Sequence, residues 1–147
     1  MSAPDTANTN TIPAKPLPVI TPENRPFWDG CKANELRLQQ CVDCRHIRYP
    51  LNPVCPICLS AATDWVKMSG RGTVFSYIVF HQVYHPAYKD DVPYNVALVQ
   101  LDEGPRMFSN VVGASNDAVK VGAALQVVFD PVTPEVTLPR FRLAEGQ

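Results

Sequence analysis

Residues 41–58 read CVDCRHIRYPLNPVCPIC, and the two cysteine pairs in this stretch decide how the chain folds. Cys41 and Cys44 form one CxxC turn, and Cys55 and Cys58 form a second one after ten intervening residues. Each turn brings two sulfurs to one side of a tight knuckle. Two knuckles supply four thiolates at tetrahedral angles, which is a preferred ligand set of Zn²⁺. The spacing therefore predicts a four-cysteine zinc site.

Four sulfurs fill the coordination sphere of zinc, so the predicted site is structural and has no position for water or substrate. Its binding energy would be folding energy for a segment too small to have its own core. Two alternatives stay open: iron in the same cage, as a redox centre, or two disulfides, which need an oxidising compartment. Arg45, His46 and Arg48 follow the first pair, and we expect them to offset the negative charge of the site, partly as donors to its ligands.

A short helix is expected before the ribbon. Thr21-Pro22-Glu23 has a hydroxyl N-cap, a proline at the first helical position and an acid in the first turn. Phe27, Trp28 and Cys31 lie within one turn of each other and form an apolar stripe, on which Cys31 is expected as a buried thiol. Because the helix is short and contains Gly30, we expect it to need an external surface, with Phe27 and Trp28 exposed for that purpose.

From Gly70 onward the pattern changes to strands, while Leu36 and Leu38 predict a short strand that enters the first cysteine pair. Runs rich in Val, Phe and Tyr are separated by turn residues. They predict strands at residues 72–80, 94–101, 106–113, 125–132 and 138–143, with a helical turn within 115–121. Five strands in so short a segment suit a barrel of the OB type.

The predicted fold class is mainly β, with an N-terminal helix, a rubredoxin-like zinc ribbon and a C-terminal five-stranded OB-fold barrel. We expect residues 1–20 to be a flexible Pro-rich tail, 21–68 to hold the helix and the zinc ribbon, and 69–147 to form the barrel. The tail lacks an apolar period, so burial cannot offset the entropy of ordering it.

The 147-residue chain has a formal net charge of -1 and a sequence pI of about 6.3, so it has no global basic field that attracts nucleic acid or anionic lipid. No apolar stretch approaches the length of a membrane span. The N-terminus has no basic region followed by an apolar one, as a secretory signal would. The expected location is the cytoplasm.

His81 and His85 flank the loop after the first barrel strand, which continues into Tyr84 and Tyr88. We expect a surface loop with aromatic packing; the alternative places these four side chains beside a ligand or a partner's active site. The chain contains no Gly-rich phosphate loop, G-x-S-x-G elbow or HExxH motif. Because no nucleophile, base and oxyanion donor can be assembled, catalysis by the isolated chain is not expected.

A zinc ribbon followed by an OB barrel also suggests single-stranded nucleic-acid binding, in which Phe75, Tyr77 and Phe108 could stack on bases. The barrel half is mildly acidic, whereas such binding needs a positive groove. The aromatic residues are more simply explained as core and barrel-wall residues. Nucleic acid is therefore the alternative function, and an iron-containing electron carrier is a third hypothesis.

The chain resembles a known family over residues 21–143. The similarity rests on Pro26-Phe27-Trp28, the cysteine ribbon, GRGTV at 70–74, VALVQLDEGPR at 96–106 and LPRF at 138–141. These features are similar to the bacterial and archaeal zinc-ribbon/OB-fold proteins that accompany acyl-CoA enzymes. All four ribbon cysteines match, and no catalytic residue carries over.

The resemblance implies a non-catalytic accessory subunit of a hetero-oligomer. It implies that a separate thiolase-fold thiolase or aldolase carries the chemistry, and that this chain docks on it and helps to bind or channel the CoA thioester. Arginine recognises phosphate bidentately, which suits such a ligand. The residues expected to face the partner or CoA are Phe27, Trp28, Arg45, Arg48, His81, His85 and Arg106.

Overall fold

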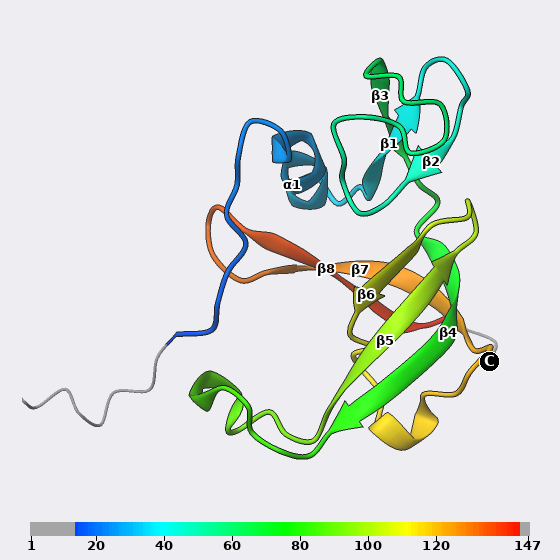
Figure 1. Cartoon of the computed structure of the whole chain (residues 1–147). Helices are drawn as coiled ribbons and strands as arrows, with labels where there is room; N and C mark the ends of the chain where they lie inside the picture. Colours follow the sequence, from blue (N-terminus) through cyan, green and yellow to red (C-terminus); the bar gives the residue numbers. More distant parts are fainter. Residues whose placement is uncertain (1–13, 145–147) are drawn as a thin grey trace, which may run out of the picture.

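Two antiparallel sheets and one helix make up the computed structural model, which describes residues 14–144 (Figure 1). The sheet of the zinc ribbon has the order β2-β1-β3, and the larger sheet has the order β6-β5-β4-β7-β8. The elements in chain order are α1 (Arg25–Lys32), β1 (Arg37–Cys41), β2 (Ile47–Arg48), β3 (Thr63–Lys67), β4 (Arg71–Phe80), the 3₁₀ turn η2 (Pro86–Tyr88), β5 (Tyr94–Leu101), β6 (Arg106–Ser109), the 3₁₀ turn η3 (Asn116–Ala118), β7 (Ala124–Pro131) and β8 (Thr137–Leu143).

The predicted mainly β fold is confirmed, and the five strands of the barrel lie close to their predicted positions. The predicted helical turn within 115–121 is η3. Of the predicted tail, residues 1–13 lie outside the described part of the chain. Residues 14–20 have no regular secondary structure, and Lys15 forms an ion pair of 2.5 Å with Asp91. No helix within residues 14–144 is long and apolar enough to cross a membrane.

Helix α1 begins three residues later than predicted. Asn24, not Thr21, is the N-cap, and Pro26 lies in the first turn, where a proline costs no hydrogen bond. Thr21 and Asn24 bond reciprocally, from the Thr21 N–H to Asn24 Oδ1 at 2.7 Å and from the Asn24 N–H to Thr21 Oγ1 at 3.3 Å. Pro26 decides where the helix begins, because a helix that began at Thr21 would hold Pro26 in its interior.

The prediction that Phe27 is exposed was wrong. Phe27 is only 4% exposed and Cys31 is fully buried, because α1 packs its apolar stripe onto β1, β7 and β8 of its own chain. Trp28 is half-buried and meets the Phe27 ring edge-on at 4.9 Å. The external surface that the helix needs is thus largely the barrel itself.

The larger sheet curls into a barrel, and β5 explains how it is filled. Its residues alternate strictly: Asn95, Ala97, Val99 and Leu101 point into the core, and their neighbours point outward and are half-buried. Val111, just beyond β6, forms a parallel bridge with Phe141 on β8. This bridge brings the two edges of the sheet together, as an OB-type barrel requires.

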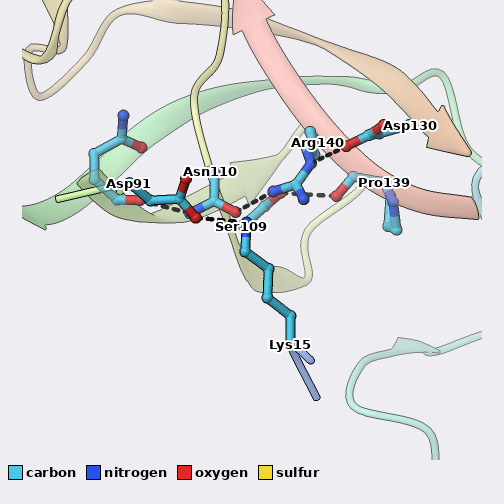
Figure 2. Close-up of polar contacts among 8 residues, drawn as sticks. Lys15, Asp91, Ser109, Asn110, Asp130, Pro139 and Arg140 are labelled. Atoms are coloured by element: carbon cyan, nitrogen blue, oxygen red, sulfur yellow. Dashed lines mark hydrogen bonds and ion pairs between the residues drawn. The ribbon is translucent and has the colours of Figure 1, made fainter. Parts of the chain in front are cut away.

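Polar side chains complete this closure (Figure 2). Arg140 on β8 donates from Nε to Asp130 at 2.7 Å and from Nη1 to Asn110 Oδ1 at 2.5 Å. Ser109 Oγ donates to the carbonyl of Pro139 at 2.9 Å. Two backbone hydrogen bonds join these side-chain contacts at the seam, from the Phe141 N–H to the Asn110 carbonyl at 3.0 Å and from the Val112 N–H to the Phe141 carbonyl at 2.8 Å. The seam between β6 and β8 therefore closes without a continuous strand ladder.

One core joins the helix, the base of the ribbon and the barrel. Phe27, Leu36, Leu38 and Met68 belong to the same cluster of buried side chains as Phe141 inside the barrel. Burial of apolar surface stabilises by about 25 cal/mol per Å², so this shared cluster fixes the ribbon relative to the barrel.

Gly70 allows the close approach of the ribbon linker to β7. Its φ is +79°, and its carbonyl accepts from the Val127 N–H at 2.8 Å, so that a Cβ there would overlap Val127 Cγ1.

We predict that Gly70→Ala lowers the free energy of unfolding by about 3 kcal/mol, from left-handed strain and overpacking together. Gly113→Ala is the matched control, since its φ is +78° and its surroundings are open, and it should cost only about 1 kcal/mol. Urea denaturation of the zinc-loaded protein measures both; equal losses would contradict the packing argument.

Candidate metal centre

Two knuckles with the same backbone geometry hold the four ribbon cysteines. In the first, the Arg45 N–H donates to the Cys41 carbonyl at 2.9 Å; in the second, the Leu59 N–H donates to the Cys55 carbonyl at 2.8 Å. The residue after each knuckle is left-handed, with φ of 69° at Arg45 and 67° at Leu59. Such strain in non-glycine residues persists where the surroundings impose it, as a metal held by both turns would.

The four sulfurs converge on one point. All lie within 4.8 Å of one another, with 3.5 Å between the Sγ atoms of Cys41 and Cys58 and 3.6 Å between those of Cys44 and Cys55. A tetrahedral zinc ion with ligands at 2.3 Å requires sulfurs about 3.8 Å apart, so the cage fits the ion. All four cysteines are free thiols, so the disulfide alternative is wrong.

Backbone N–H groups face the sulfurs, as metal-bound thiolates require. The Cys44 N–H approaches Cys41 Sγ at 3.5 Å, and the Ile57 N–H approaches Cys55 Sγ at 3.4 Å. The first of these bonds lowers the pKa of the Cys41 thiol to about 6, which favours the thiolate that binds metal. Cys41 and Cys55 are buried while Cys44 and Cys58 are exposed, so one side of the cage faces solvent.

Arg48, which we expected near the sulfurs and among the residues that face the partner or CoA, lies largely inside the ribbon. Arg48 is only 3% exposed, and it donates from Nε and Nη2 to the Asn52 carbonyl at 3.0 and 2.8 Å and from Nη2 to Thr63 Oγ1 at 2.7 Å. Gln39 Oε1 accepts from the Asn52 N–H at 2.8 Å. Arg48 and Gln39 thus fix the loop that links the two knuckles, and the donors to the sulfurs are backbone groups.

The remaining candidate residues lie apart from one another. Arg45 is exposed beside the first knuckle, whereas His81 and His85 lie on the loop between β4 and β5 at the far end of the barrel (Figure 1). His81 is exposed; His85 is half-buried and accepts at Nδ1 from the Ala87 N–H at 3.0 Å. Arg106 is exposed on β6. No single site therefore unites these residues.

Sequence reasoning missed an exposed aromatic face on the outside of β4, β5 and β6. Phe108 is 70% exposed and Phe75 is 45% exposed, so neither is a core residue, and both lie on the outer face of the barrel wall. Phe75 follows the inward-facing Val74, and a β-bulge between Val74 and Ser76 leaves Phe75 and Ser76 both exposed, which simple alternation does not predict. The Arg106 guanidinium lies 3.7 Å from the Phe75 ring centroid. We call Phe75, Arg106 and Phe108 the aromatic face.

A closed four-thiolate ribbon joined to an OB barrel defines the class to which the chain belongs. Two family descriptions match it: "ChsH2, rubredoxin-like zinc ribbon domain" over residues 28–64 and "ChsH2, C-terminal OB-fold domain" over residues 65–130. A "DUF35 domain-containing scaffold protein" of Methanothermobacter thermautotrophicus is 33% identical over 97 residues, which cover 65% of this chain and 72% of that protein. The chain belongs to this DUF35 family of ChsH2-like zinc-ribbon/OB-fold proteins, as the sequence resemblance implied.

Solved structures agree. A chain of the "Ltp2-ChsH2(DUF35) aldolase" superposes with a TM-score of 0.78 at 39% identity, over 86% of this chain and 98% of that one. A Sulfolobus solfataricus DUF35 protein superposes with a TM-score of 0.61 at 20% identity and shows the same fold.

Two longer relatives are named as enzyme subunits. The "Probable enoyl-CoA hydratase alpha subunit" of Thermomonospora curvata is 40% identical over 133 residues, which are 90% of this chain and 41% of that protein. The "3-oxo-4,17-pregnadiene-20-carboxyl-CoA hydratase alpha subunit" of Mycobacterium tuberculosis is 40% identical over 103 residues, which are 70% of this chain and 32% of that protein. This chain therefore spans less than half the length of these two relatives.

We predict one zinc ion per chain, whose loss unfolds the ribbon. Loss of a residue that hydrogen-bonds a metal ligand weakens metal binding by roughly 10–100-fold. Cys44→Ser removes a ligand itself, so it should weaken zinc binding by more than that. Acidification should release the ion, because its ligands must be deprotonated. Metal analysis and chelator competition measure this. Cys31→Ser is the matched control and should keep its zinc; stoichiometric iron in the purified protein would contradict the assignment.

Cys31 should behave differently from the other thiols. Burial raises the pKa of its thiol from 9.0 to about 12, so the folded chain holds this proton more tightly than the unfolded chain does. The resulting stabilisation is complete below about pH 9 and is lost as the pH rises toward 12. With a thiol reagent at pH 8, we expect Cys31 to react only after denaturation and the four ribbon cysteines to react after zinc chelation. Rapid labelling of Cys31 in the native protein would contradict its burial.

Proposed function

We propose that this chain is a non-catalytic accessory subunit of a heteromeric acyl-CoA-metabolising complex. It docks on a thiolase-fold thiolase or aldolase and helps to bind or channel the CoA thioester. The observation that carries the proposal is the likeness, at 39% identity over 98% of its length, to a chain solved in an aldolase complex. The names of the scaffold proteins and hydratase subunits among its relatives support the same role.

The metal centre supports a structural and not a catalytic contribution. Its four thiolates complete the tetrahedral coordination of zinc, which leaves no open position to activate water or to polarise a carbonyl. The described titratable residues outside it, including His81 and His85, lie dispersed over the barrel and the ribbon. In this proposal, the partner therefore supplies the nucleophile and the base.

The aromatic face is the surface we assign to the catalytic partner. Aromatic side chains and arginine are enriched at the centres of protein interfaces, where charged residues of other kinds are depleted. Phe108 faces Leu98 across the β5–β6 ladder, and Ile78 on β4 extends the apolar surface. Arg106 donates from Nε to Gln100 Oε1 at 2.7 Å while it lies over Phe75, so the guanidinium is already positioned. An apolar patch with a carboxylate opposite Arg106 would complement it.

The same face favours single-stranded nucleic acid as a second candidate, since bases stack on exposed aromatic rings and on guanidinium groups. The net charge of -1 opposes this function. Salt-dependent binding of an oligonucleotide at low ionic strength would support it, and no binding there would exclude it.

We predict that Phe108→Ser weakens binding to the thiolase-fold partner by about 30-fold or more, as the loss of an interface anchor does. Thiolase-like chains co-expressed with this one are the partners to test, and co-purification with titration calorimetry measures the affinity. Val121→Ser is the control, since Val121 is an exposed apolar residue of the η3–β7 loop, away from the aromatic face. Catalytic turnover by the isolated chain, or equal partner affinity for both variants, would contradict the proposal.

A further inference from the structure

A cleft of about 640 Å³ separates the zinc ribbon from the turn between β5 and β6. Figure 1 shows this turn at the end of the β5–β6 hairpin, directed toward β2. Residues 45–50 of the ribbon line one wall, together with Asn52 and Pro56, and residues 103–105 of the turn line the other. The volume lies in the range of small-molecule sites, which are typically apolar with a few placed polar groups.

Two polar atoms at this cleft have no partner. Within residues 14–144, Arg48 Nη1 and Glu103 Oε1 are the buried side-chain nitrogen and oxygen atoms that make no hydrogen bond. The other atoms of both groups are occupied: Arg48 holds Asn52 and Thr63, and Glu103 Oε2 accepts from the Ser69 N–H at 2.8 Å. A buried donor or acceptor without a partner costs about 1–3 kcal/mol, so a ligand that satisfies both would recover this energy.

The charges on the two walls restrict the chemistry of that ligand. An anion would meet the carboxylate of Glu103, and a cation would meet the guanidinium groups of Arg45 and Arg48. A neutral group that accepts from Arg48 and donates to Glu103 suits both walls. A trans secondary amide has one acceptor and one donor that point in opposite directions. Ile47, Tyr49 and the prolines of the cleft supply apolar walls for the atoms on either side of the amide.

We propose that this cleft binds a ligand through a secondary amide, held between Arg48 Nη1 and Glu103 Oε1. The turn that carries Glu103 borders open space, because Gly104 has no atom within 4 Å of its Cβ position and the Glu103 side chain is only partly buried. A secondary amide occurs both in the pantetheine arm of an acyl carrier and in a peptide segment. With pantetheine as the source, the inference rests on the proposed function and deepens it, since pantetheine is part of CoA, and its test needs no catalytic partner.

The test is a nuclear magnetic resonance titration of the full zinc-loaded chain with pantetheine and, separately, with N-acetylalanine methylamide. At least one probe should cause saturable shifts in the backbone amides of residues 45–48 and 103–104. Shifts with pantetheine alone identify the carrier arm as the source of the amide, and shifts with the peptide analogue alone identify a peptide segment. Because no partner is present, failure here leaves the accessory-subunit proposal unaffected.

Glu103→Gln is the decisive variant. Its carbonyl can still accept from Ser69, but an NH₂ donor replaces the free oxygen, so affinity for the probe should fall about tenfold. Asp102→Asn is the matched control. Asp102 is the neighbour of Glu103 in the sequence and forms an exposed ion pair with Arg71, so this variant loses the same charge but should change the affinity for the probe by no more than about twofold. The proposal is overturned if neither probe shifts the cleft, if both variants bind equally, or if a high-resolution structure shows a water on both atoms that neither probe displaces.

Discussion

The convergence of four sulfurs on one point is the constraint on which the ribbon depends. Around the knuckles, Val42, Val54, Ile57 and Leu59 all point toward solvent, so apolar burial cannot hold this end of the chain together. The strand β2 is only two residues long. The metal cage therefore replaces a core at the tip, and the Arg48–Asn52 contacts keep the loop between the knuckles in the shape that the cage requires.

At its other end, the ribbon relies on ordinary packing. Leu36 and Leu38 enter the same buried cluster as the barrel interior, and Phe27 of the helix covers that junction. Two different forces, metal coordination at the tip and apolar burial at the base, thus fix one small domain. The result is a rigid scaffold that keeps the aromatic face and the ribbon–barrel cleft at fixed positions.

The sequence predicted the elements that are defined by the spacing of residues close together in the chain. The cysteine spacing defined the cage, and the alternation in Tyr94–Leu101 defined a barrel strand. It could not predict the burial of Phe27, because an apolar stripe does not reveal whether its cover belongs to the same chain. Nor could it predict that Ser76 is exposed beside Phe75, because a bulge shifts the alternation there. The burial of Arg48 was equally beyond it, because burial of a charged side chain depends on carbonyl groups brought in by the fold.

The barrel is not equally stiff all around, because its seam has fewer backbone hydrogen bonds than its strand ladders. Along β4 and β5 the sheet has a long ladder. The seam beside β6 has one bridge to β8 with two backbone hydrogen bonds, and the side chains of Ser109, Asn110 and Arg140. Side-chain contacts tolerate small displacements that a ladder resists. The barrel is therefore stiffest along β4 and β5, and its most compliant line runs along the seam beside β6.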